Sequence, residues 1–200
     1  LLVRLSELPG ITVSTFVRGD DVANLPALVA HADCVFHLAG ENRPMDDAAF
    51  TRVNTGLTQA LCEALAAEHQ RSGRQLPLVL ASSTQAERDN PYGQSKLAAE
   101  QAVQKLSTTT GHTAIIYRLP GVFGKWCKPN YNSVVATFCH NIARGLPIQI
   151  NDTSAHLQLV YVDDVVSSFI AALDAPATGL TRGEVTPLYT TTLGELAQQI

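Results

Sequence analysis

Tyr92 and Lys96 are four residues apart and form the pair in this sequence best suited to chemistry. On a helix, residues at this spacing lie on one face, about one turn from each other. A free tyrosine titrates near pH ~10, and a close ammonium favours the phenolate and lowers its pKa. Tyr92 is therefore predicted to give or take a proton at a carbonyl or alcohol oxygen. An ordinary helix pair is the alternative for these two residues alone.

Two serines upstream favour the catalytic interpretation. The apolar run 79–81 ends in Ser82 and Ser83 and predicts a buried strand whose carboxyl end opens on a ligand-binding crevice. A hydroxyl there could hydrogen-bond the same substrate oxygen as Tyr92. Proton transfer at one end of a C–O bond suggests hydride transfer at its carbon. No side chain supplies a hydride, so the pattern predicts a nicotinamide cofactor.

Composition restricts the class of protein. Two hundred residues, 46% of them hydrophobic, suffice for one good core or one domain with a small appended lobe. A net charge of -4 without a basic run argues against nucleic acid or an anionic membrane as the main partner. No apolar stretch reaches membrane-spanning length, and the start lacks a signal-peptide pattern. A cytoplasmic protein acting on small molecules is expected.

The four cysteines are scattered, without a C-x-x-C pair. They predict reduced, mostly buried thiols, and indicate neither a metal site nor a disulfide framework. The first residue is leucine and the only methionine is Met45, so a longer protein is expected.

Strands and helices alternate over the first part of the chain. A helix tail is expected over 1–8, and Asp20 is the expected cap of a helix that runs to Ala32. A long helical pattern covers 46–69. Apolar, β-branched runs predict strands at 11–17, 34–40, 78–82 and 113–118. This order requires parallel strands with right-handed crossovers, so the predicted fold class is α/β, a Rossmann-like doubly wound parallel sheet.

The rhythm changes after Pro120. A helix to about Arg144, a helix over 163–173 and a final helix from Leu193 are expected, with strands at 147–150 and 157–162. We therefore predict a cofactor-binding Rossmann domain of residues 1–124 and 157–175. Residues 125–156 and 176–200 are the predicted substrate-binding lobe.

Motifs spread over almost the whole chain resemble the extended short-chain dehydrogenase/reductases. They are His37-Leu38-Ala39-Gly40, Asn54-Thr55-Gly56, Ser82-Ser83, Tyr92-x-x-x-Lys96, Tyr117-Arg118-x-Pro120-x-x-Phe123-Gly124 and Tyr161-Val162-Asp163-Asp164-Val165. The runs 38–44 and 123–133 further resemble one subfamily, the capsular-polysaccharide and O-antigen reductases of UDP-2-acetamido-2,6-dideoxy-β-L-arabino-hexul-4-ose. These enzymes act on the route to UDP-N-acetyl-L-fucosamine.

The resemblance implies NADPH-dependent reduction of the C4 ketone of a UDP-linked 2-acetamido-2,6-dideoxy-hexulose. Tyr92 would protonate the C4 oxygen, Lys96 would hold the nicotinamide ribose hydroxyls, and Ser83 would orient the C4 carbonyl. Ser82 is the alternative for this last role and is otherwise an expected cofactor contact. A nucleotide-sugar 4-epimerase or dehydratase with the same three residues is the second hypothesis. A catalytically silent NADP-binding scaffold is the third.

Further cofactor contacts are expected at strand ends. Arg18 ends the predicted second strand of the nucleotide-binding half, where an arginine suits the 2′-phosphate of NADP. A solvated turn charge is the alternative, and the neighbouring Asp20 leaves NAD open. The other expected contacts are Leu38, Ala39, Gly40, Leu119 and Pro120. His37 is expected to be a satisfied core histidine. Asn54 is expected to be a structural amide, with a proton-relay role as the alternative.

Substrate contacts are predicted in three stretches of the chain. Asn42, Arg43 and Thr84 follow strand ends, together with Ser83. Extended members often carry Asn and Arg at the places of Gly121 and Leu157. The side chains that could supply the missing diphosphate and sugar contacts are Lys125, Lys128, Asn130 and Asn132. Two lysines merely exposed on a loop are the alternative.

Two segments of the subfamily are missing from these 200 residues. They are the Gly-x-x-Gly-x-x-Gly turn before Arg18 and the C-terminal cupin domain. The strand before that turn would lie mid-sheet, between 11–17 and 78–82. Residues 1–200 alone are therefore expected to be unstable, to bind NADPH poorly and to be inactive. The resemblance also implies a homodimer that pairs through the Tyr92 helix and the long helix before it.

Overall fold

The computed structural model describes residues 1–42, 46, 48–174 and 179–200. The chain forms two compact units. The first unit comprises Leu1–Arg118 and Phe169–Glu184, and the second comprises Leu119–Ser168 and Val185–Ile200. The predicted division into a cofactor-binding domain and a substrate-binding lobe stays a prediction.

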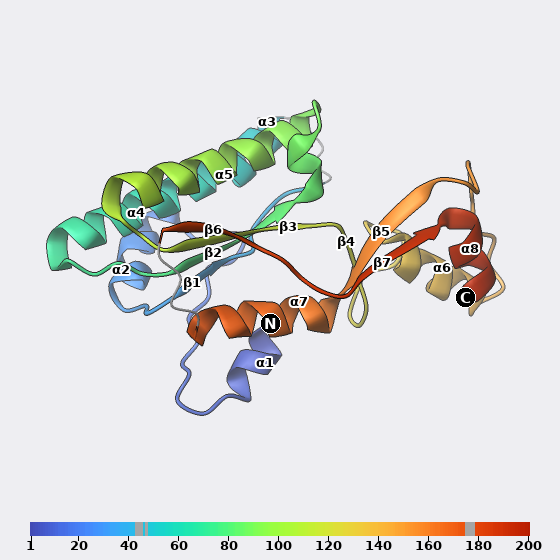
Figure 1. The fold of residues 1–200 in the computed structure, drawn as a ribbon, viewed down its shortest axis with the longest axis horizontal. Helices are drawn as coiled ribbons and strands as arrows, with labels where there is room; N and C mark the ends of the chain where they lie inside the picture. The colour runs from blue at the N-terminus through green and yellow to red at the C-terminus, as the bar shows by residue number, and fades with distance from the viewer. Residues whose placement is uncertain (43–45, 47, 175–178) are drawn as a thin grey trace. The chain divides into compact units, whose positions relative to one another are not determined.

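A four-stranded sheet forms the centre of the first unit (Figure 1). Its order is β1-β2-β3-β6, with β1 (Val35–His37), β2 (Leu78–Ser83), β3 (Ala114–Leu119) and β6 (Leu180–Gly183). β1 pairs with β2 in parallel, and β3 pairs with β6 in parallel. The strands predicted at 34–40, 78–82 and 113–118 are therefore confirmed, whereas β6 was not predicted.

Helices connect these strands, as the alternating pattern requires. They are α1 (Leu2–Ser6), the 3-10 turn η1 (Val22–Asn24), α2 (Leu25–Ala30), α3 (Ala48–Phe50), the π-helix η2 (Thr51–Gly56), α4 (Leu57–Ser72), the 3-10 turn η3 (Thr84–Glu87) and α5 (Pro91–Thr110). α5 begins where Pro91 fixes φ and the Asn90 side chain accepts from the Gly93 N–H. It ends at Gly111, which adopts a left-handed conformation.

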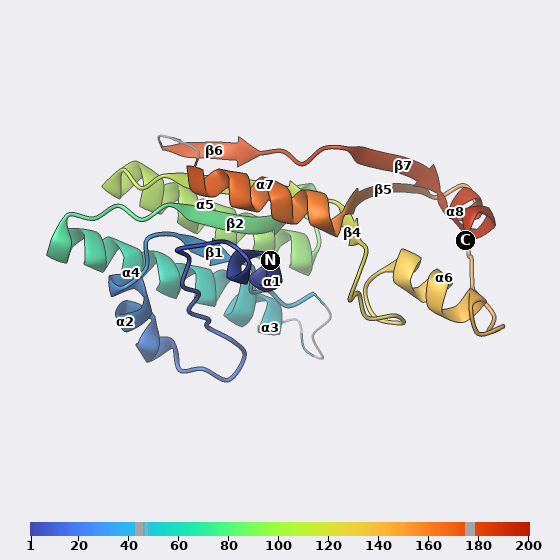
Figure 2. The ribbon, with the colours of Figure 1, turned by 90° about the horizontal axis from the view of Figure 1, so that it is seen from below.

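Side chains of the strands alternate between the two faces of the sheet. Other parts of the chain pack against each face. On one face Leu78, Leu80 and Ile116 pack into one core with Leu65 of α4 and Val103 of α5. On the other face Phe36 and Tyr117 pack against Phe169, with ring centroids 6.2 and 4.8 Å apart. Phe169 lies on α7 (Val162–Asp174), seen below the sheet in Figure 1 and in front of it in Figure 2. A doubly wound α/β class is confirmed.

The second unit contains a smaller sheet in the order β4-β5-β7. Its strands are β4 (Gly121–Phe123), β5 (His156–Tyr161) and β7 (Leu188–Thr192), with β4 parallel and β7 antiparallel to β5. It also contains the helices α6 (Val134–Ile142) and α8 (Leu193–Gln199). Thr192 and Glu195 form a capping box at the start of α8. The strand at 157–162 and both helices were predicted, but β4 and β7 were not.

Three local predictions are wrong. Residues 11–17 and 147–150 form neither helix nor strand. A strand needs a hydrogen-bonded neighbour, and neither segment has one in the described part of the chain. Asp21, not Asp20, caps the helical segment from Val22, while Asp20 accepts from the Val17 N–H instead.

The cysteines are free, and only Cys62 is buried. Cys34 and Cys127 are half-buried, and Cys139 is exposed, so the expectation of mostly buried thiols is wrong. Among the described residues, every helix is too short or too polar to span a bilayer.

Candidate active site

Ser83, Tyr92 and Lys96 come together where β2 ends and α5 begins. The side chain of Ser83 forms a hydrogen bond with Tyr92. Lys96 Nζ donates to the carbonyl oxygen of Ala81 at 3.1 Å, two residues before Ser83. The three residues that the sequence singled out therefore share one place in the first unit.

Neighbouring side chains hold Tyr92 in position. Its ring packs against the buried ring of Phe50, with centroids 5.7 Å apart. Gly93 lets the first turn of α5 approach η3, because a Cβ there would overlap the carbonyl oxygens of Gln85 and Arg88. Ser83 caps η3 by accepting from the Gln85 N–H. The turn that follows Ser83 is thus packed directly against the turn that carries Tyr92.

Burial raises the pKa of Tyr92 above its usual value, and the hydrogen bond with Ser83 opposes this rise. The sequence predicted the opposite direction from the close ammonium. The reason is that a half-buried phenolate loses hydration, and burial also lowers the pKa of Lys96. A raised pKa keeps Tyr92 protonated at neutral pH, as a general acid requires.

The surroundings of Lys96 fit the ribose of a nicotinamide cofactor. Its side chain is 7% exposed, and Ala81 O is the single hydrogen-bond acceptor of its ammonium among the described residues. An ammonium has three donors, so two are free for ribose hydroxyls. Gly40 keeps the approach open, because a Cβ there would lie 3.0 Å from Nζ of Lys96.

Asn54 fixes the turn that follows Gly40. Its side chain accepts from the Glu41 N–H at 2.7 Å and donates to the Glu41 carbonyl and to Ser95 Oγ, both at 2.9 Å. Asn54 lies within the π-helix η2, a conformation that often marks functional sites. These bonds give Asn54 the structural role expected of it and connect the end of β1 to α5.

His37 is buried beside this turn. Thr58 Oγ1 donates to the Asn54 carbonyl, so it accepts from Nε2 of His37 at 2.7 Å. This contact makes His37 a satisfied core histidine. Burial, together with the charge of Lys96, lowers the pKa of His37 from 6.5 to about 4.

The buried imidazole predicts that stability falls in acid. The folded chain keeps His37 neutral down to pH about 4, whereas the unfolded chain protonates it near 6.5. The free energy of unfolding should therefore decrease by about 3 kcal/mol as the pH falls from about 6.5 to 4, at about 1.4 kcal/mol per pH unit. Urea unfolding at several pH values measures this loss. His37→Gln should flatten the slope, and the exposed-site control His156→Gln should leave it unchanged; equal slopes in all three proteins would refute the assignment.

The expected cofactor contacts other than Arg18 lie at strand ends, whereas Arg18 follows the segment 11–17, which forms no strand. Leu38 is exposed after β1 and Ala39 is half-buried. Leu119 is the last residue of β3, and Pro120 follows it. Arg18 is largely exposed, and its Nη2 contacts Glu41 Oε2 at 2.6 Å. Glu41 was missed by the sequence analysis, because nothing local indicates a partner 23 residues away.

The side chains of Ser82 and Ser83 have different hydrogen-bond partners, Glu100 for Ser82 and Tyr92 for Ser83. Ser82 is buried and donates to Glu100 Oε1 at 2.5 Å. Ser83 is therefore the hydroxyl beside Tyr92, whereas Ser82 faces the core. Asn42 is half-buried and Thr84 is exposed. Arg43 lies outside the described residues.

The predicted lysine and asparagine contacts lie in one exposed loop of the second unit. Lys125 Nζ forms an ion pair with Asp163 at 3.0 Å and lies 5.2 Å from the ring centroid of Trp126. Lys128 Nζ lies 5.5 Å from the ring of Tyr131. Asn130 and Asn132 are exposed. Trp126, for which no role was predicted, is 77% exposed and has a positive φ of 63°.

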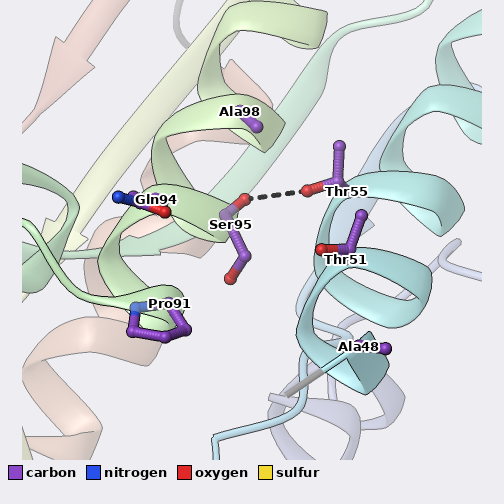
Figure 3. A pocket seen from close by; sticks show the side chains of 7 residues that line it. All are labelled: Ala48, Thr51, Thr55, Pro91, Gln94, Ser95 and Ala98. Carbon is purple, nitrogen blue, oxygen red and sulfur yellow. Dashed lines mark hydrogen bonds between the residues drawn. The ribbon is translucent and has the colours of Figure 1, made fainter.

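A hollow of about 480 Å³ lies between α5 and the segment 48–55 (Figure 3). It is lined by Ala48, Thr51, Thr55, Pro91, Gln94, Ser95 and Ala98. Thr55 Oγ1 donates across it to the Ser95 carbonyl. None of the three catalytic candidates lines this hollow, although Pro91 and Ser95 precede Tyr92 and Lys96 in the sequence.

Known proteins resemble this chain over its whole length. The chain is 50% identical over 200 residues to the UDP-2-acetamido-2,6-beta-L-arabino-hexul-4-ose reductase of Pseudomonas aeruginosa, covering 100% of this chain and 53% of that protein. The crystal structure of the capsular polysaccharide assembling protein CapF from Staphylococcus aureus matches with a TM-score of 0.79 and 37% identity, over 98% of this chain and 53% of that one. The chain thus spans about half the length of these relatives.

More distant structures share the fold. The UDP-glucuronic acid 4-epimerase of Bacillus cereus, solved with NAD, has a TM-score of 0.71 at 20% identity, over 86% of this chain and 61% of that one. Residues 6–186 match the NAD dependent epimerase/dehydratase family. Because this match covers most of the sequence, the chain belongs to the NAD dependent epimerase/dehydratase family.

Proposed function

We propose that this chain is the catalytic part of an NADPH-dependent reductase, which reduces the C4 ketone of a UDP-linked 2-acetamido-2,6-dideoxy-hexulose. Such an enzyme would serve capsule or O-antigen precursor biosynthesis in the cytoplasm. The observation that carries the proposal is the hydrogen-bonded Ser83–Tyr92 pair beside the buried Lys96. The 50% identity to a protein named as a reductase of such a sugar supports this substrate class.

Each residue of the site has a task in this reaction. Tyr92 donates its phenolic proton to the C4 oxygen, and Ser83 hydrogen-bonds the same oxygen. Lys96 holds the ribose hydroxyls through the free N–H groups of its ammonium. When bound, the nicotinamide cofactor supplies the hydride. Leu38, Ala39, Gly40, Leu119 and Pro120 provide backbone and apolar contacts to the cofactor in this proposal.

The preference for NADPH rests on Arg18. Its side chain is 85% exposed, and its guanidinium is oriented by one carboxylate, that of Glu41. An exposed guanidinium suits a 2′-phosphate, with which it would form charge-assisted hydrogen bonds.

Replacing Arg18 by Ala tests the cofactor preference. The ratio of kcat/KM for NADPH to that for NADH should fall about 10- to 100-fold, because a charge-assisted hydrogen bond contributes about 1.5–3 kcal/mol. Arg52→Ala is the matched control, since Arg52 is also an exposed arginine paired with one carboxylate, that of Asp46. An unchanged ratio in the Arg18 variant would exclude this residue from 2′-phosphate recognition.

Substrate contacts are also part of the proposal. In the exposed loop of the second unit, Lys125, Lys128, Asn130 and Asn132 would bind the diphosphate and sugar. Asn42, Arg43 and Thr84 stay proposed substrate contacts from the sequence. A homodimer that pairs through α4 and α5 is proposed as the assembly, from the resemblance to related enzymes.

The stoichiometry of cofactor oxidation distinguishes the reductase from an epimerase or dehydratase. A reductase at full natural length should oxidise one NADPH for each 4-ketosugar converted, whereas an epimerase or dehydratase regenerates its cofactor in each cycle. Loss of NADPH absorbance in step with product formation is the expected result. Product formed without net oxidation would favour the epimerase or dehydratase. A protein that binds NADP but does not convert the 4-ketosugar would be the catalytically silent scaffold.

A further inference from the structure

We propose that Glu100 is a positioning residue of this active site, whose buried carboxylate sets the register of α5 against β2 and supplies a negative charge that acts on Lys96. This inference rests on the proposed function, because it concerns the same catalytic residues. Glu100 itself touches neither Tyr92 nor Ser83 in any described contact.

Glu100 collects hydrogen bonds from three strands. Its side chain is 3% exposed. Ser82 Oγ of β2 donates to Oε1 at 2.5 Å. Arg118 of β3 donates through Nη2 at 2.7 Å and Nε at 2.9 Å, and Arg182 of β6 donates through Nη1 at 2.9 Å. One carboxylate on α5 therefore joins β2, β3 and β6.

The spacing along α5 connects this network to the reacting residues. Tyr92, Lys96 and Glu100 follow one another at intervals of four residues, so they lie on one face of the helix. Two successive turns of that face bind two successive residues of β2. Lys96 binds the carbonyl of Ala81, and Glu100 binds the hydroxyl of Ser82. Ser83 comes next, so a shift of either contact would move Ser83 relative to Tyr92.

The charge of Glu100 acts on Lys96. Burial opposes ionisation of Glu100, but hydrogen bonds from Arg118, Ser82 and Arg182 hold its pKa below the usual value. Burial lowers the pKa of Lys96, and the carboxylate of Glu100 raises it. The carboxylate therefore opposes the desolvation that favours a neutral amine.

The other ionisable groups around Lys96 and Glu100 are few in the described chain. His37 on β1 interacts with Lys96, and its pKa of about 4 makes it neutral above pH 5. Tyr92 lies one turn away on the same helix face. Glu87 of η3 reaches the network through Arg118 Nη1, at 2.7 Å, and is itself largely exposed. Glu100 is the buried carboxylate whose charge acts on Lys96.

Two substitutions that remove charges of opposite sign, Glu100→Gln and Arg182→Met, test the proposal in the full-length protein. Glu100→Gln removes a negative charge, so the Tyr92–Lys96 pair should lose its first proton more easily. The alkaline limb of kcat/KM should then move to lower pH by about one unit, with a fall in kcat of about tenfold or more. Arg182→Met leaves the carboxylate less neutralised, so the limb should move to higher pH.

Glu87→Gln is the matched control. It makes the same chemical change at the other carboxylate that binds Arg118, and the limb should stay in place. A limb that does not move in Glu100→Gln, or that moves in the same direction in the Glu100 and Arg182 variants, would overturn the proposal. If Glu100→Gln does not fold, Arg182→Met decides alone, and a limb identical to that of the parent protein refutes the charge effect. Failure of the parent protein to oxidise NADPH refutes the proposed function instead, before any variant is compared.

Discussion

Replacing Tyr92 by Phe in the full-length protein is expected to lower kcat by about two to four orders of magnitude. The substitution removes the proton that reaches the C4 oxygen, and it keeps the ring that packs against Phe50. NADPH affinity should stay within a few-fold of the parent value, because Lys96 and the strand ends are unchanged.

Steady-state kinetics and a fluorescence titration of NADPH measure the two quantities separately. Tyr189→Phe is the matched control, since Tyr189 is an exposed tyrosine of β7 whose ring packs on Phe123. The control should turn over normally. Normal turnover by the Tyr92 variant would refute the role of general acid, and a loss of cofactor affinity without a loss of kcat would assign Tyr92 to binding.

Replacing Gly93 by Ala is expected to have the largest effect on stability. A Cβ at this position would overlap the carbonyl oxygens of Gln85 and Arg88, which are backbone atoms and have no rotamer to change. Overpacking of this kind typically costs about 1–3 kcal/mol, and more where the backbone must move. Because the displaced backbone is η3, which Ser83 caps, activity should fall with stability.

Urea unfolding of Gly93→Ala beside Gly56→Ala measures this effect. Gly56 has helical φ and ψ, and the nearest atom to its added Cβ is Thr51 O at 3.6 Å. Alanine there should stabilise the chain slightly, by about 0.5–1 kcal/mol. An equal change in both variants would mean that the close approach of α5 to η3 does not matter.

The sequence predicts the elements whose signals are local. The apolar run before Ser82 forms β2, and Pro91 begins α5 because its missing N–H costs nothing in the first turn. The spacing of Tyr92 and Lys96 then places both on one helix face. These features depend on neighbours within a few residues, so no knowledge of the tertiary fold is needed.

Other features depend on partners far along the chain. The β-branched run 11–17 has strand propensity but no hydrogen-bonded neighbour in the described chain, so it forms no strand. Arg182 and Glu100 meet although 82 residues separate them. The direction of the Tyr92 pKa depends on burial, which the distance to Lys96 alone does not reveal. Local pattern therefore predicts the candidate reacting residues, whereas their electrostatics follows from the packed structure.

The most direct test of the proposed reduction is isotope transfer. The full-length protein would be given the UDP-linked 4-ketosugar and NADPH deuterated at the transferable position of its nicotinamide ring, and the product examined by mass spectrometry and NMR. The proposed reduction predicts one deuterium at C4 of the product for each NADPH oxidised. A product without deuterium at C4, or one formed while NADPH is not consumed, would contradict it.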